Sequence, residues 1–176
     1  TLEATGLPPS ALELEITETV VQTGSATVES LHRLRALGVS IALDDFGMGY
    51  SSLTSLEQLP ITRVKLDRQL VAGVDSNPRS AAIVRSIVAL CHGLGLQVVA
   101  EGVERSAQLE FLSQCGPVSV QGYLLAQPVE ALAAATEAQA AAERARRTLA
   151  AAAGLGHREA GEHLVFVGSS GRRRIP

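Results

Sequence analysis

Residues 39–67, VSIALDDFGMGYSSLTSLEQLPITRVKLD, contain one strand–helix–strand unit. The apolar run VSIAL (39–43) is typical of a buried strand, and the helical segment after the glycine-bearing turn ends at Pro60. The run ITRVKLD (61–67) then has the β-branched and apolar content of a second strand. Because a crossover through a short helix brings the chain back in the same direction, the two strands are predicted to be parallel neighbours.

The same alternation of a short strand with a helix occurs five times along the chain. The predicted strands are 11–17, 39–46, 61–67, 96–103 and 118–125, and the predicted helices are 25–38, 51–59, 79–95, 105–116 and the alanine-rich segment from Val129. Gly38, Gly95 and Gly116 end three of these helices just before the next strand. Near-continuous apolar runs such as VSIAL are expected where helices cover both faces of a parallel sheet. The pattern predicts an α/β fold.

Composition excludes several classes of protein. The chain has 176 residues, 46% of them hydrophobic, and a net charge of -3, which fits a globular domain and gives no basic excess for binding a nucleic acid polymer. No segment approaches the run of about 20 apolar residues that spans a membrane. Cys91 and Cys115 lack metal-site spacing and are interpreted as reduced core thiols of a cytoplasmic protein. Because Met48 is the only methionine, we expect the chain to be a piece of a longer protein.

Acidic residues follow the predicted strands at their carboxyl ends. The ligand-binding edge of a βα fold is expected there. A single carboxylate at such a position also fits a solvated strand end or a helix cap, but five that converge would repel one another unless cations neutralise them. Hard divalent ions with oxygen ligands do this. The five carboxylates are Glu15, Asp44, Asp45, Glu101 and Glu104.

Two divalent ions held in this way would form the usual clamp for displacement at a phosphate ester. Asp44 and Asp45 are expected at the last position of their strand, where both side chains can turn toward the mouth. Lys65, on the next strand, can orient the attacking water or offset charge on the phosphate. Replacing Lys65 by alanine is therefore expected to slow the reaction with little effect on the fold.

Five motifs at these positions resemble the EAL-domain family, bacterial phosphodiesterases that open cyclic di-GMP to linear pGpG. The motifs are LELEITE (12–18), DDFGMGYSSL (44–53), VKLD (64–67), VVAEGVE (98–104) and VQGYLL (120–125). The resemblance implies a TIM-like (β/α)8 barrel whose carboxyl mouth binds two Mg²⁺ or Mn²⁺ ions.

The resemblance also implies roles for single residues. Glu15, Asp44, Asp45 and Glu101 are similar to the metal ligands of the family, and Lys65 is similar to the lysine that contacts the catalytic water. Glu101 also resembles the general base of the family, and Glu104 is similar to the residue beside it. Gln121 is similar to the glutamine near the metal-bound water. Glu18 is similar to the glutamate that steadies the loop 47–52, which in the family links metal binding to dimerisation.

The chain is short for a complete barrel. About five βα units are present, and the Glu-Ala-Leu signature and metal-binding asparagine of the family have no counterpart, while Met48 stands where the family usually has a small residue. We expect a partial barrel over 1–132, an alanine-rich helix or linker over 133–154 whose later turns project, and a disordered tail over 155–176. This chain is expected to be inactive alone, and its full-length parent active.

Partners and alternatives follow from the same resemblance. It implies cyclic di-GMP as ligand, a homodimer through the barrel, and N-terminal sensory or GGDEF (diguanylate cyclase) domains in the parent. A catalytically inactive cyclic di-GMP receptor or protein-interaction module is the main alternative, although every visible ligand position keeps a competent residue. Metal-assisted enolisation on a similar barrel also uses strand-end carboxylates and a lysine, but it does not require the DDFG or QGY segments.

Overall fold

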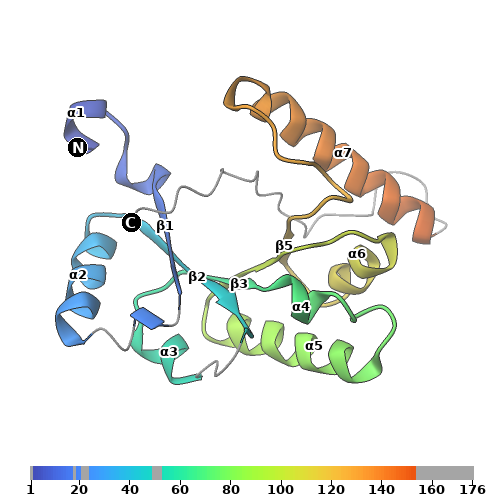
Figure 1. Ribbon diagram of the computed structural model, residues 1–176, viewed down its shortest axis with the longest axis horizontal. Coiled ribbons are helices and arrows are strands. Elements are labelled where there is room, and N and C mark those ends of the chain that lie inside the picture. The colour runs from blue at the N-terminus through green and yellow to red at the C-terminus, as the bar shows by residue number, and fades with distance from the viewer. Residues whose placement is uncertain (1, 18, 21–23, 49–52, 154–176) are drawn as a thin grey trace.

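The computed structural model describes residues 2–17, 19–20, 24–48 and 53–153. Within them the strands form one five-stranded parallel sheet with the order β1-β2-β3-β4-β5 (Figure 1). The strands are β1 (Glu13–Thr17), β2 (Ser40–Phe46), β3 (Arg63–Leu66), β4 (Gln97–Ala100) and β5 (Val118–Val120). The predicted α/β class and the five parallel strands are confirmed. A sheet in which strand order follows chain order is the arrangement of a TIM-like barrel.

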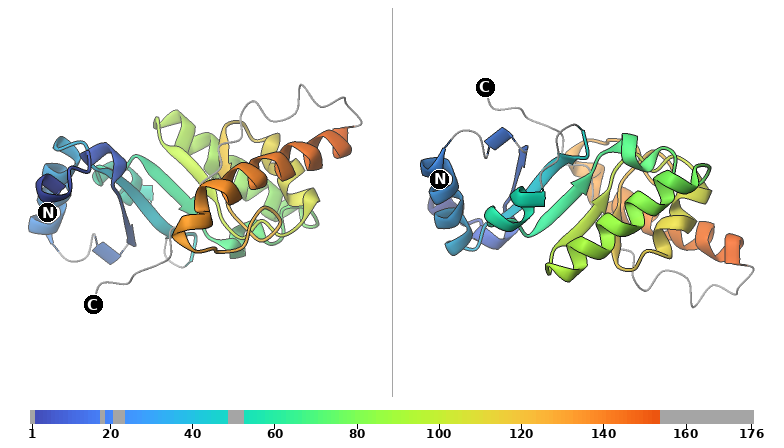
Figure 2. Two further views of the ribbon diagram at one scale, coloured as in Figure 1. Left: turned by 90° about the horizontal axis from the view of Figure 1, so that it is seen from above. Right: turned by 90° about the horizontal axis from the view of Figure 1, so that it is seen from below.

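The helices lie around the outside of this sheet in chain order (Figures 1 and 2). Helix α4 was not predicted, because its four residues directly follow β3 and carry no periodic pattern of their own. The described helices are α1 (Leu2–Thr5), η1 (Pro9–Ala11), α2 (Ser25–Ala36), α3 (Leu53–Gln58), α4 (Arg68–Val71), α5 (Pro78–Gly93), α6 (Ser106–Ser113), η3 (Ala131–Ala133) and α7 (Ala134–Ala153).

The two faces of the sheet differ in chemistry. One face joins the hydrophobic core through alternate strand residues such as Ile41, Val64 and Val98. Since side chains alternate along a strand, the residues between them face the other way, where a closed barrel would have its interior. That second face carries the charged strand residues together with the buried Ala42 and Val99. Its polar residues are Glu13, Glu15, Asp44, Arg63, Lys65 and Gln97.

Helix α7 does not project from the domain as the composition suggested. Ala145 is 0% exposed and Leu149 is 6% exposed, and both belong to the core cluster. The helix packs against α6, and the side chain of Arg144 donates to the carbonyl oxygen of Leu125. Alanines on the buried stripe allow the two helices to approach closely. The domain boundaries at residues 132 and 154 stay predictions.

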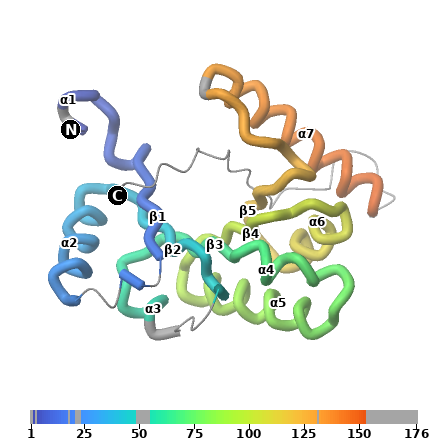
Figure 3. The backbone as a smooth tube through the Cα atoms, viewed as in Figure 1, coloured from blue at the N-terminus to red at the C-terminus, as the bar shows by residue number. Residues whose placement is uncertain are grey.

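The sheet is open within the described part of the chain. Strands β1 and β5 are its two edges, with α1 beside the first and α7 toward the second (Figure 3).

Cys91 and Cys115 are both free thiols. Among the described residues, no helix combines the length and apolar character that crossing a bilayer requires.

Candidate active site

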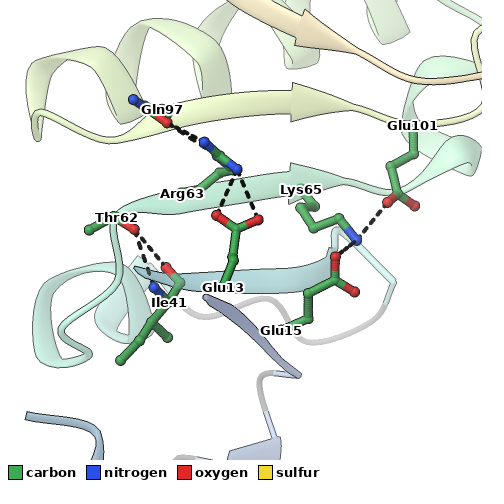
Figure 4. Close-up of polar contacts among 8 residues, drawn as sticks. All are labelled: Glu13, Glu15, Ile41, Thr62, Arg63, Lys65, Gln97 and Glu101. Atoms are coloured by element: carbon green, nitrogen blue, oxygen red, sulfur yellow. Dashed lines mark hydrogen bonds and ion pairs between the residues drawn. The ribbon is translucent and has the colours of Figure 1, made fainter. Parts of the chain in front are cut away.

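Three carboxylates from different segments converge on one ammonium group. Lys65 Nζ lies 2.7 Å from Glu15 Oε1, 2.9 Å from Asp44 Oδ1 and 2.8 Å from Glu101 Oε1. These residues come from β1, β2, β3 and the segment just after β4, so four consecutive strands supply one cluster. Figure 4 shows the Lys65 side chain reaching Glu15 on one side and Glu101 on the other. Of the five carboxylates predicted to converge, Glu15, Asp44 and Glu101 meet at Lys65, and we call these four residues the Lys65 cluster.

Most of the Lys65 cluster is withdrawn from water. The exposed fraction of the side chain is 8% for Lys65, 10% for Asp44 and 13% for Glu101, whereas Glu15 keeps 39%. Burial acts to lower the pKa of Lys65, but hydrogen bonds to Glu101, Glu15 and Asp44 outweigh it and raise the pKa above its usual value. The amine is therefore a permanent cation near neutral pH, a hydrogen-bond donor that does not act as a base.

The charges of the Lys65 cluster do not balance. Three carboxylates facing one ammonium leave two formal negative charges in a largely buried site, which a divalent cation would offset. In the part of the chain that the structure describes, no three acidic, histidine or cysteine side chains are arranged so that they could hold an ion, and Lys65 lies between the carboxylates. The oxygen donors of Glu15, Asp44 and Glu101 are nevertheless of the type that hard divalent cations prefer.

Asp45 owes its position to an irregularity in β2. The pairing of β2 with β3 passes from Leu43–Val64 to Phe46–Leu66, so that β2 contains one more residue than β3 over this interval. Asp45 has φ 54°, the only positive φ among the described non-glycine residues. The aspartate pair is thus inside β2 and not at its last position as predicted. The bulge breaks the strict alternation that would send two adjacent carboxylates to opposite faces.

Fewer contacts define the positions of the other predicted site residues than define the Lys65 cluster. Gln121 is held beside the end of β4, because its backbone N–H donates to Ala100 O at 2.9 Å and its carbonyl accepts from Val103 N at 3.0 Å. Glu104 lies three residues beyond Glu101, and its side chain is exposed. Glu18 and most of the loop 47–52 lie outside the described residues, so their predicted role is not addressed by the structure.

One residue important to this site was missed in the sequence. Gln108 on α6 is 1% exposed, and its Oε1 accepts from the backbone N–H groups of Glu104 and Arg105, each at 2.9 Å. Its Nε2 donates to Val71 O at 3.2 Å, which ties the loop after β4 to α4. The signal was a Gln at the third position of a helix, the capping-box spacing. Arg105 adds a bidentate contact to Asp75 at 2.7 and 2.8 Å.

Residues 1–128 match the family model described as the EAL domain. The chain belongs to the EAL domain family. Among curated relatives, the cyclic di-GMP phosphodiesterase RocR of Pseudomonas aeruginosa is 45% identical over 124 residues, covering 70% of this chain and 32% of RocR. The bifunctional diguanylate cyclase/cyclic di-GMP phosphodiesterase MucR of the same organism is 48% identical over 126 residues, covering 71% of this chain and 18% of MucR.

Solved EAL structures share the fold. PaMucR phosphodiesterase in complex with c-di-GMP aligns with a TM-score of 0.69 at 46% identity, covering 74% of this chain and 53% of that one. Klebsiella pneumoniae BlrP1 with manganese and cy-diGMP aligns with a TM-score of 0.65 at 37% identity, covering 72% of this chain and 33% of BlrP1. A calcium complex of BlrP1 is also similar. The chain spans a third or less of the length of the curated EAL relatives described here.

Proposed function

We propose that this chain supplies the lysine and several metal-binding carboxylates of a phosphodiesterase that hydrolyses cyclic di-GMP to linear pGpG. The observation that carries the proposal is the Lys65 cluster, in which three carboxylates share one ammonium and retain an excess of negative charge. The names of RocR and MucR, and the c-di-GMP complex of PaMucR, support the choice of substrate.

Two divalent ions, Mg²⁺ or Mn²⁺, complete the proposed site. Glu15, Asp44, Asp45 and Glu101 are the proposed ligands, and the manganese complex of BlrP1 supports the choice of a divalent ion. The chemistry that such ions supply when bound is activation of water and stabilisation of charge on phosphate oxygens. Carboxylates are the appropriate ligands, because they combine hard oxygen donors with the negative charge that a divalent ion offsets.

The chain's own residues have separate proposed tasks. Lys65, held as a cation by its three partners, donates a hydrogen bond to the attacking water or to a phosphate oxygen on which negative charge develops. Glu101, which follows β4 and contacts Lys65 at 2.8 Å, is proposed to accept a proton from that water. Gln121, fixed beside Glu101 by backbone hydrogen bonds, is proposed to orient the water, with Glu104 supporting the loop.

The proposed location and partners concern the whole protein. The double activity in the name of MucR supports a cyclase domain in the same polypeptide, and sensory domains are an equivalent possibility from the family resemblance. A homodimer through the barrel and a cytoplasmic location are further parts of the proposal. Light scattering of the full-length protein with and without Mn²⁺ tests the dimer.

Turnover by the full-length protein tests the enzymatic proposal against the inactive receptor. We expect Mn²⁺-dependent formation of pGpG from cyclic di-GMP, measured by chromatography, and loss of this activity in Glu101→Gln. Binding of cyclic di-GMP without any pGpG would instead identify a receptor. Because five strands leave the sheet open, the isolated 176-residue chain is expected to be inactive in the same assay.

A further inference from the structure

A second polar layer lies two residues behind the Lys65 cluster on the same face of the sheet. Arg63 Nη1 donates to both carboxylate oxygens of Glu13, at 2.8 and 2.6 Å. Arg63 Nη2 and Nε donate to Gln97 Oε1, at 2.6 and 3.2 Å. Figure 4 shows this guanidinium between Glu13 and Gln97, alongside Lys65. The layer has no part in the reaction proposed above, and it was not recognised in the sequence.

The contact between Arg63 and Glu13 crosses a strand. Strands β1 and β3 are both neighbours of β2 and not of each other. The β2 residue in between is Ala42, which is aligned with Glu15 on β1 and with Arg63 on β3. Glu13 itself is aligned with Ser40, so the two β2 side chains along this contact are the small ones of Ala42 and Ser40, and long side chains from β3 reach β1 above them.

Arg63 is level with Glu15, yet it binds Glu13. Adjacent strands are about 4.8 Å apart, so the Cα atoms of Arg63 and Glu15 are separated by about 10 Å, which extended Arg and Glu side chains bridge. Arg63 instead turns back two residues along β1, and Glu15 is left to Lys65 at 2.7 Å. Arg63 Nη1 donates to both oxygens of Glu13, and its other two nitrogens donate to Gln97, so all three nitrogens are engaged away from Glu15.

We propose that Glu13 is a positioning residue that holds the Arg63 guanidinium away from Glu15 and thereby keeps Glu15 available to Lys65 and to a divalent ion. The inference depends on the proposed function only in naming the ion as a partner of Glu15. Without Glu13, the guanidinium would pair with Glu15 and occupy its oxygen atoms.

Mn²⁺ binding to the full-length protein in the absence of substrate tests this role. By electron paramagnetic resonance we expect Glu13→Gln to weaken Mn²⁺ binding about tenfold, as is typical for residues that orient metal ligands. Arg63→Met alone should bind nearly as the unaltered protein does. The double variant Glu13→Gln/Arg63→Met should recover most of the lost affinity, since the competing guanidinium is gone. Glu29→Gln, at an exposed position of α2, is the matched control.

The double variant distinguishes a positioning role of Glu13 from a role in which Glu13 only links β1 to β3. If it binds Mn²⁺ as weakly as Glu13→Gln, or if Glu13→Gln binds normally, the proposal is wrong. A crystal structure of Glu13→Gln gives a second readout: Arg63 is expected within hydrogen-bond distance of Glu15, and an Arg63 that stays on position 13 overturns the proposal. Hydrolysis is assayed in parallel, so that an inactive protein with this order of Mn²⁺ affinities refutes the phosphodiesterase and leaves the role of Glu13 intact.

Discussion

At the scale of single residues, Lys65 determines how the three carboxylates around it are tolerated. Removing the ammonium in Lys65→Met leaves Asp44 and Glu101 buried without their shared cation, so we now expect the fold as well as the rate to respond. We expect a loss of about 3 kcal/mol in unfolding free energy in EDTA, as for a buried ion pair that loses one partner. Mn²⁺ should restore much of it. Urea unfolding with EDTA and with Mn²⁺ measures both, and equal stability of the two proteins in EDTA would exclude this role.

The same contacts fix how Lys65 responds to pH. Its pKa is raised in the folded protein, so its contribution to stability is fully present below the unfolded pKa of about 10.4 and is lost only as the pH rises through the still higher folded value. Lys65 therefore adds no pH dependence to the turnover rate between about pH 5 and pH 9. In this range, the turnover rates of the unaltered protein and of Lys65→Arg should rise and fall at the same pH values. An alkaline limb that disappears in the arginine variant would show that Lys65 titrates there.

Asp45 combines a backbone and a charge requirement, which two substitutions separate. Its φ of 54° is tolerated by Asp and Asn better than by other residues with a side chain. Asp45→Asn should keep the stability within about 0.5 kcal/mol and lower turnover at least tenfold, while Asp45→Ala should also lose about 1 kcal/mol of stability. Thermal unfolding and turnover of both variants test this. Equal stability of the two would indicate that the bulge imposes no backbone constraint.

At the scale of elements, the buried Gln108 connects α6 to the loop that carries Glu101. Gln108→Ala removes the acceptor of two backbone N–H groups and one of the two donors to the carbonyl of Val71, which costs about 2–3 kcal/mol. Turnover should fall as well, because Glu101 is no longer held against Lys65. Gln114→Ala, an exposed glutamine at the end of the same helix, is the control. If both variants unfold at the same denaturant concentration, the Gln108 network does not fix the loop.

The sequence predicted the strands and longer helices more completely than it predicted the contacts of the site residues. The strands and the longer helices followed from local apolar runs and from helix-ending glycines, but the polar residues on one face were not predicted, although ELEIT and RVKL alternate charged and apolar residues. The bulge at Asp45 could not be seen, because it depends on how β2 pairs with β3. The Arg63–Glu13 contact depends on the register between β1, β2 and β3, which the local sequence does not encode.

At the scale of the whole molecule, the packing of α7 determines whether the alanine-rich segment belongs to the folded domain or projects as a linker. Ala145 is 0% exposed against α6, and a larger side chain there would push the helices apart. Ala145→Leu should therefore lower the unfolding free energy by about 1–3 kcal/mol. Ala138→Leu, at an exposed position of the same helix, should change it by less than about 0.5 kcal/mol. Since leucine and alanine both favour helix, intrinsic propensity does not explain a difference between the two positions. If urea unfolding gives the same small change for both, α7 is a projecting linker, as its composition suggested, and the barrel edge next to β5 is left uncovered.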